Sequence, residues 1–148
     1  MLRNFDTPFG KYFVEIHDGL IRHAYFDEFN GHSDNIQTGD QAMSELHRYC
    51  SSLRLQPQGT PFQLQVWKCI GGVTSGKTAT YKEIACGLGY PSAVRAVASA
   101  ISRNPIAYLI PCHRIVRSNG EIGGYRWNSS RKKIILNYEN IQLKFPLV

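Results

Sequence analysis

"TATYKEIACGLGYPSAVRAVASAISRNP", residues 78–105, predicts two short helices joined by a tight turn. Thr80 and Glu83 have the spacing of a capping box, in which the threonine caps a new helix and the glutamate reaches back, so we expect a helix over residues 81–88. A glycine-tyrosine-proline triplet interrupts it, and a second helix follows over residues 92–103. The pair is a candidate helix-turn-helix, although many helical domains contain this arrangement without touching DNA.

The two faces of the second helix differ in chemistry. One face is apolar at helical spacing and should point to the core, namely Val94, Val97, Ala98 and Ile101. The opposite face carries small side chains around one long cation, namely Ser92, Arg95, Ala96 and Ser99. Small side chains let a helix backbone come close to a crowded surface, where Arg95 could reach into a base stack. An ordinary exposed helix is the more frequent explanation when this helix is considered alone.

The segment before this pair also predicts a helix. "TPFQ" places Thr60 as the N-cap, a proline in the first turn and Gln63 where its side chain can reach back. The side chains expected to point largely inward are Phe62, Val66, Trp67 and Ile70. Prolines and a glycine just before this helix mark a joint, so we divide the chain into residues 1–58 and 59–148.

The N-terminal half predicts a β-hairpin and one helix. Residues 11–16 and 20–26 are rich in β-branched and aromatic residues, and an Asp-Gly pair lies between them. Such a pair is typical of a two-residue hairpin turn. A polar loop is expected over residues 30–40, followed by an amphipathic helix over residues 41–50.

The charge of the chain is divided unevenly. Its net charge is +6, but residues 1–59 carry five Lys/Arg and eight Asp/Glu, while residues 60–148 carry twelve and three. The basic second half favours a polyanionic partner such as nucleic acid, with a solvated basic face as the alternative. The four cysteines form no C-x-x-C pair, which argues against a zinc ribbon and a disulfide framework. Because no apolar leader or bilayer-length stretch is present, we expect a soluble, intracellular, reduced protein.

Cys112, in "PCHRIV", could be a structural thiol, a metal ligand or a nucleophile. Pro111 fixes the backbone just before it. The adjacent His113, together with Arg114 and Arg117, adds positive potential that favours the thiolate. A metal site is disfavoured because no second ligand pair has suitable spacing. A nucleophile is therefore the favoured interpretation.

A nucleophilic cysteine needs a proton acceptor, and His113 is the nearest candidate. Adjacent side chains usually point apart, so His113 would act more easily through an intervening water. A carboxylate should orient this histidine, and the second half has only three acidic residues. Glu83 is assigned to the helix cap and Glu121 to an Asn-Gly turn region, so Glu139 is the best candidate by elimination.

Four motifs together resemble the O6-alkylguanine-DNA alkyltransferases, also called methylated-DNA–protein-cysteine methyltransferases. They are "GTPFQLQVWKCI", the two-helix stretch quoted above, "IPCHRIV", and "GGY" followed by a lysine-rich helix that ends at Glu139. The match extends from residue 59 to about residue 140, whereas the first half resembles the family only in its hairpin. The resemblance implies an α+β fold: a small N-terminal α/β domain with an antiparallel β-hairpin, then a mostly helical, winged-helix-like DNA-binding domain with a helix-turn-helix.

The resemblance implies a DNA repair reaction that needs no cofactor. Cys112 would accept the alkyl group from O6 of guanine in duplex DNA by one in-line displacement, and O4-alkylthymine stays open as a second substrate. The cysteine stays alkylated, so each molecule would react once. Glu139, His113 and a water form the implied relay that makes the thiolate. Asn104 matches the hinge asparagine that braces the active-site loop.

Because the target atom lies inside the duplex, the resemblance also implies base flipping. Arg95 resembles the finger that fills the vacated stack, and Tyr81 the tyrosine that crowds the phosphate and donates a hydrogen bond to the guanine. Lys82, Tyr90 and Ser118 fall at positions that contact the DNA backbone in relatives. The family lays this helix in the minor groove, so binding should depend on salt and hardly on sequence.

The resemblance implies a set of pocket residues as well. The backbone carbonyls of the cysteine and of Ile115 would read guanine N2, the backbone amide of Arg126 would face O6, and Tyr125 and Ile101 would form walls. "YRWN" departs from relatives that have small residues after the tyrosine, and Trp127 should narrow the pocket. We therefore expect poor acceptance of bulky benzyl adducts relative to methyl.

Zinc is not expected in the N-terminal half, because its candidate ligands lack a recognisable spacing; they are Cys50, His17, His23, His32 and His47. The implied partner is double-stranded DNA carrying O6-alkylguanine, and no membrane is involved. The protein would be a monomer in the cytoplasm of a prokaryote or in the nucleus of a eukaryote.

Three rival functions remain. The first is an alkyltransferase-like binder, although that class replaces the acceptor cysteine. The second is a helix-turn-helix regulator that uses the thiol as a sensor, and the least favoured is a cysteine hydrolase.

Overall fold

The computed structural model describes residues 1–29 and 36–139, an α+β chain whose contacts define two compact units. The first unit comprises Met1–Gln58 and Pro105–Ala107, and the second comprises Gly59–Asn104 and the chain from Tyr108 onward. The chain therefore leaves the second unit for three residues and returns to it shortly before the cysteine motif.

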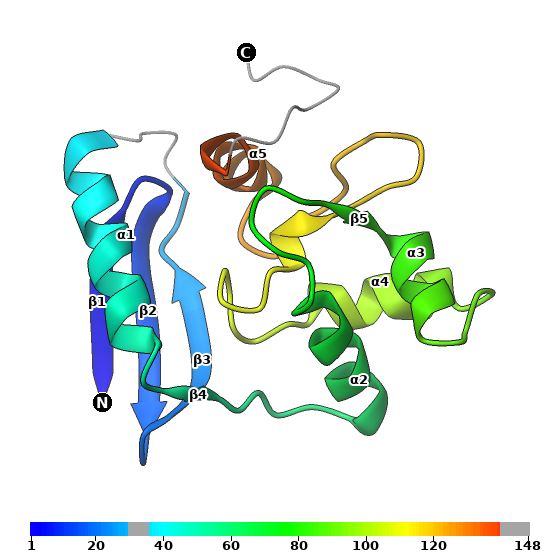
Figure 1. The fold of residues 1–148 in the computed structure, drawn as a ribbon, viewed down its shortest axis with the longest axis horizontal. Helices are drawn as coiled ribbons and strands as arrows, with labels where there is room; N and C mark the ends of the chain where they lie inside the picture. Colours follow the sequence, from blue (N-terminus) through cyan, green and yellow to red (C-terminus); the bar gives the residue numbers. More distant parts are fainter. Residues whose placement is uncertain (30–35, 140–148) are drawn as a thin grey trace. The chain divides into compact units, whose positions relative to one another are not determined.

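A four-stranded sheet and one helix make up the first unit (Figure 1). Its strands are β1 (Leu2–Thr7), β2 (Gly10–His17), β3 (Leu20–Phe26) and β4 (Arg54–Leu55), and its helix is α1 (Ile36–Cys50), which packs against β1. The first three strands are antiparallel neighbours, and β4 joins β3 in parallel. The predicted hairpin is confirmed as β2–β3, and its turn residues Asp18 and Gly19 both have positive φ, as a type I′ turn requires.

Two features of this unit differ from the sequence predictions. β1 was not predicted, because Phe5 is its one buried side chain and the strand has no apolar alternation. α1 begins at Ile36, so the predicted loop over residues 30–40 extends too far, and residues 30–35 lie outside the described part of the chain. The helix turns Met43, Leu46 and Cys50 into the core.

Residues 105–107 belong to the core of the first unit through their backbone. The amide of Ala24 donates to the carbonyl of Pro105 at 3.0 Å, and the amide of Ala107 donates to the carbonyl of Ala24 at 2.8 Å. The buried hydroxyl of Tyr12 donates to the carbonyl of Ala107. These bonds hold the short segment extended beside β3.

The second unit is mostly helical. Its elements are α2 (Pro61–Ile70), α3 (Tyr81–Gly87), α4 (Val94–Ser102) and α5 (Ser129–Tyr138), the 3-10 turn η1 (Cys112–Arg114), and the strands β5 (Ala79–Thr80) and β6 (Ile115–Val116). Both predicted capping boxes are confirmed, one at Thr60 and one at Thr80. Because β5 leads directly into α3 and β6 directly follows η1, the parallel β5–β6 pairing brings the cysteine motif beside the start of α3.

α4 is rotated relative to the predicted orientation. Its buried side chains are Val97, Ala100 and Ile101. Val94 and Ala98, which were expected in the core, are half-buried and line a pocket instead. The reason lies in α2, where the buried Trp67 donates from Nε1 to the carbonyl of Ala100 at 2.8 Å and so turns that side of α4 inward.

Gly59→Ala tests the packing around Trp67. A methyl group on Gly59 would lie 2.6 Å from Cη2 of the indole, which is 3% exposed and has little room to move. We expect the substitution to lower the free energy of unfolding by about 1–3 kcal/mol. The matched control is Gly87→Ala, because its methyl group would meet nothing within 4 Å. This control should stabilise the helix by about 0.5–1 kcal/mol. Urea unfolding followed by tryptophan fluorescence measures both, and equal effects would contradict the packing argument.

Candidate active site

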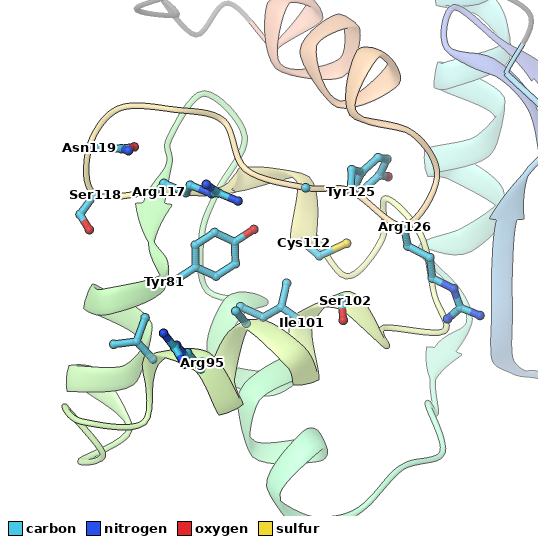
Figure 2. A pocket seen from close by; sticks show the side chains of 13 residues that line it. Tyr81, Arg95, Ile101, Ser102, Cys112, Arg117, Ser118, Asn119, Tyr125 and Arg126 are labelled. Atoms are coloured by element: carbon cyan, nitrogen blue, oxygen red, sulfur yellow. The ribbon is translucent and has the colours of Figure 1, made fainter.

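A pocket of about 640 Å³ lies between α3, α4 and the loop that follows β6 (Figure 2). Residues from distant parts of the sequence line it, including Tyr81, Arg95, Ile101, Ser102, Cys112, Ser118, Tyr125 and Arg126. Cys112 lines the pocket, and in Figure 2 its sulfur points toward the side of Arg126, while the Tyr81 ring lies on the other side of the cysteine with its hydroxyl directed toward it. The pocket therefore gives the predicted nucleophile an approach route.

Asn104 holds the thiol in place from the core side. Its amide Nδ2 donates to Sγ of Cys112 at 3.2 Å and to the carbonyl of Ile110 at 3.0 Å. Asn104 is fully buried and Cys112 is 4% exposed. The asparagine therefore fixes both the sulfur and the backbone that precedes it, which is the bracing expected of this residue.

His113 and Glu139 meet although 26 positions separate them. Nε2 of His113 lies 3.1 Å from Oε1 of Glu139. Arg114 binds the same carboxylate at both oxygens, with Nε at 3.0 Å from Oε1 and Nη2 at 2.5 Å from Oε2, and its Nη1 donates to the carbonyl of Val73 at 2.8 Å. Burial would raise the pKa of Glu139, but the hydrogen bonds from His113 and Arg114 hold it at about 2. Glu139 is therefore a carboxylate.

The ring of His113 is enclosed by aromatic side chains. The Tyr108 ring is stacked on it at 5.4 Å between centroids and 5° between planes, and the Tyr125 ring stands edge-on at 6.5 Å. Burial lowers the pKa of His113. With Nε2 directed at Glu139, Nδ1 is the ring atom that can accept a proton, and it has no hydrogen-bond partner among the described protein atoms.

The positive charges near Cys112 differ from those expected. Burial raises the pKa of the thiol, and the groups that oppose this are Asn104, the ammonium of Lys132 and the guanidinium of Arg126. The prediction assigned this role to Arg114 and Arg117. Arg114 is bound to Glu139, while Arg117 lines the pocket and pairs with Glu121 at 3.3 Å, and neither is among the groups that lower the pKa of the thiol.

Lys132 is a site residue that sequence reasoning missed. It is fully buried, and its Nζ donates to the carbonyls of Ile115 at 2.6 Å and Gly124 at 3.1 Å. Burial lowers its pKa to about 8. The signal available in the sequence was three consecutive basic residues at the start of a helix, which normally indicates a solvated face. Lys132 joins β6 to the pocket loop and places a cation near the thiol.

The residues predicted to meet DNA fall into two groups. Tyr81, Arg95 and Ser118 line the pocket with Cys112. Lys82 and Tyr90 are exposed on or just after α3 but do not line it.

Some of the residues predicted to form the pocket walls line the pocket, and others do not. Ile101, Tyr125 and the side chain of Arg126 line the pocket. Ile115 is buried behind it. Trp127 is not part of the lining, because its ring packs edge-on against Tyr125 at 5.4 Å. The narrowing by Trp127 stays a prediction, because Trp127 contacts the pocket only through Tyr125.

The described part of the chain holds neither a metal-binding cluster nor a membrane-spanning helix. Within residues 1–29 and 36–139, no group of three or more His, Cys, Asp or Glu side chains is arranged to hold a metal ion, and His32 lies outside those ranges. No helix in the same ranges has the length and apolarity to cross a membrane.

The sequence model of the family described as "6-O-methylguanine DNA methyltransferase, DNA binding domain" matches residues 61–141, which include α2 to α5 and the pocket. The chain belongs to this family. A methylated-DNA–protein-cysteine methyltransferase of Mycobacterium leprae is 31% identical over 95% of the chain and 93% of the relative.

Solved members of the family have the same fold. A crystal structure of OGT from Mycobacterium tuberculosis in complex with DNA matches with a TM-score of 0.77 and 31% identity, covering 93% of this chain and 91% of that one. The Regulatory protein ada of Salmonella typhimurium is 49% identical over 88 residues, and the chain spans 25% of the length of that relative.

Glu139→Gln tests the buried carboxylate through its pH dependence. The pKa of Glu139 is lowered from an ordinary 4.5 to about 2. Because the folded pKa lies below the unfolded one, this group stabilises the fold above pH 4.5, and that contribution is lost as the pH falls toward 2. We expect the difference in unfolding free energy between the wild type and Glu139→Gln to be largest near neutral pH and to shrink across that window.

Glu121→Gln is the matched control for this measurement. The Glu121–Arg117 pair has side chains that are 54% and 58% exposed, so its loss should change the unfolding free energy little at any pH. Urea unfolding at a series of pH values measures both variants. A penalty at Glu139 that stays constant from neutral pH to acid would contradict the assignment of a buried carboxylate.

Proposed function

We propose that this chain is a methylated-DNA–protein-cysteine methyltransferase that moves an alkyl group from O6 of guanine in duplex DNA to Sγ of Cys112. The observation that carries the proposal is the buried thiol, hydrogen-bonded by Asn104 and next to the His113–Glu139 pair, at the base of a pocket within the matched family domain. The thioether has no route back to a thiol, so the reaction occurs once per molecule. No cofactor is needed.

The transfer is one displacement, in which one bond forms, one bond breaks and one proton is released and taken up. A sulfur electron pair forms the new S–C bond while the C–O6 bond breaks on the opposite side, and its electrons return to the guanine. The thiol proton leaves for the relay, and the released guanine takes up one proton. O4 of an alkylated thymine presents an equivalent carbon–oxygen bond, so the same displacement extends to that lesion.

The proton of Cys112 passes through a water to Nδ1 of His113. Glu139 accepts a hydrogen bond from Nε2, which leaves Nδ1 as the base, and the negative charge of the carboxylate stabilises the imidazolium that forms. Arg114 keeps Glu139 ionised and oriented. The thiolate that results is stabilised by the Asn104 amide.

DNA approaches the face that carries the open side of the pocket. Arg95 and Tyr81 line this opening from α4 and α3, where an arginine can replace an extruded base and a tyrosine can crowd the phosphate. Ser118 lies at the rim, and Lys82 and Tyr90 are exposed for backbone contacts. α3 and α4 then act as the helix-turn-helix of a winged-helix-like domain within residues 59–148, while residues 1–58, with residues 105–107, form a separate α/β domain, in a monomer.

The transfer itself is tested by intact mass. After reaction with duplex DNA that holds one O6-methylguanine, we expect the wild type to gain one methyl group on the peptide that contains Cys112, with no turnover beyond one equivalent. Cys112→Ala should gain none. Cys86→Ala is the matched control, because Cys86 is an exposed thiol and its loss should leave the gain unchanged. Tight binding without a mass change would instead make the chain an alkyltransferase-like binder.

Arg95→Ala tests base flipping separately from chemistry. Because extrusion of a base costs a few kcal/mol, we expect the loss of the finger to slow transfer from duplex DNA by roughly tenfold or more, while transfer from the free base O6-methylguanine changes little. Arg103→Ala removes the same charge from an exposed side chain at the end of α4 that does not line the pocket, and should leave the ratio of the two rates unchanged. Single-turnover kinetics measure both, and an equal slowing of both substrates by Arg95→Ala would rule out the finger role.

A further inference from the structure

Tyr108 has a backbone conformation that a tyrosine rarely adopts. Its φ is +67°, in the left-handed region that a bulky side chain avoids unless the surrounding structure fixes it there. The residue is 7% exposed and stands where the chain returns from the first unit to the second. A glycine would adopt this φ without strain. A tyrosine at this position therefore points to a role of its side chain.

The side chain of Tyr108 lies on the imidazole of His113. The two rings are almost parallel, with 5° between their planes and 5.4 Å between their centroids. In this arrangement the tyrosine turns its π face, and not its edge, to the histidine. The Tyr125 ring is instead steeply inclined to the imidazole, at 78° and 6.5 Å. Of these two aromatic neighbours, Tyr108 is the one whose face covers the histidine.

The backbone on both sides of Tyr108 is held by hydrogen bonds. The preceding residue, Ala107, has both its amide and its carbonyl hydrogen-bonded within the first unit. Two residues further on, the carbonyl of Ile110 accepts from the side chain of Asn104 at 3.0 Å. The ring of Tyr108 therefore projects from an anchored length of chain, and its direction is set by the backbone.

Under the proposed transfer, His113 becomes an imidazolium in a site that disfavours one. Burial lowers its pKa, the charges of Arg114 and Lys132 lower it further, and Glu139 raises it. The π face of a tyrosine carries partial negative charge and attracts a cation within about 6 Å of the ring centroid, most strongly where water is excluded. Because His113 is fully buried, the face of Tyr108 adds a second attraction for the charged ring to that of the carboxylate.

We propose that Tyr108 is a positioning residue of the proton relay, whose π face holds the His113 ring toward Glu139 and stabilises the imidazolium that forms during transfer. The inference rests on the proposed transfer to Cys112 and deepens it by naming a further residue of the same site. The proton balance of the relay is unchanged, because burial raises the pKa of the Tyr108 hydroxyl and this group keeps its proton.

The test measures single-turnover transfer from a duplex that carries O6-methylguanine over a range of pH values. Tyr108→Leu keeps an apolar side chain beside His113 but removes the π face, so we expect transfer near neutral pH to slow roughly tenfold. Tyr108→Phe keeps the face and should restore most of the rate. The amplitude gives the fraction of protein that reacts. A variant that folds poorly loses amplitude, whereas the proposed role changes the rate.

The pH profile separates the proposed role from a merely structural one. His113 accepts a proton only when it is neutral, so the rate falls as the pH drops through its pKa. Without the π face the imidazolium is less stable, so Tyr108→Leu should move this fall to lower pH. A substitution that only let water into the site would relieve the effect of burial and move the fall to higher pH.

Tyr25→Leu is the matched control, because it removes a tyrosine from another stacked pair in the first unit, where its ring lies 5.2 Å and 16° from that of Phe13. It should leave the rate and the pH profile unchanged. The proposal would be overturned by an unslowed Tyr108→Leu, by a shift of its profile to higher pH, or by a Tyr108→Phe variant as slow as Tyr108→Leu. If the wild type transferred no methyl group, the proposed function itself would fail.

Discussion

The arrangement of the site depends on one buried carboxylate. Glu139 follows the last turn of α5 and binds two consecutive residues of the cysteine motif, His113 and Arg114, while Arg114 reaches on to the carbonyl of Val73 after α2. Three segments are therefore fixed around one negative charge. Removal of one partner from such a cluster leaves an uncompensated buried charge, which costs about 3–5 kcal/mol. The fold tolerates the burial of these charges because every oxygen of the carboxylate is occupied.

The thiol lies where burial and polar contacts oppose each other. Burial raises the pKa of Cys112, while the Asn104 amide, Lys132 and Arg126 lower it. Lys132 is itself buried and has its pKa lowered to about 8, so a nearby thiolate and this ammonium would stabilise each other. The site thus has a buried cation available for the charged sulfur, in addition to the exposed guanidinium of Arg126. Burial also lowers the pKa of His113, so this imidazole is neutral and, under the proposed function, able to accept the proton of the thiol.

The confirmed predictions concern features that depend on residues close together in the sequence. Both capping boxes follow from the sequence because the cap and its partner are three residues apart, and the hairpin turn follows from an Asp-Gly pair. The pairing of Glu139 with His113 could be predicted because the basic half has only three acidic residues, and two of these have local roles.

The features that the sequence did not predict depend on packing between distant segments. The rotation of α4 follows from the bond between Trp67 and Ala100, which no local pattern encodes. The burial of Lys132 is decided by two carbonyl acceptors, one of them 17 positions away in β6. In the same way, Arg126 was assigned a role for its backbone amide, since the carbonyls that its side chain finds at the end of α4 are more than 20 positions distant.

Burial of the acceptor thiol suits a protein that is consumed by its own reaction. The thiolate is the reactive form of cysteine, and an exposed thiolate would react with any soft electrophile in solution. Cys112 is buried with a raised pKa, so it keeps its proton until a base removes it. Reactivity then depends on a substrate that holds its electrophilic carbon in line with the sulfur. Under the proposed function, selectivity arises from geometry and not from a strongly activated thiol, so the single turnover of each molecule is reserved for a lesion that fits.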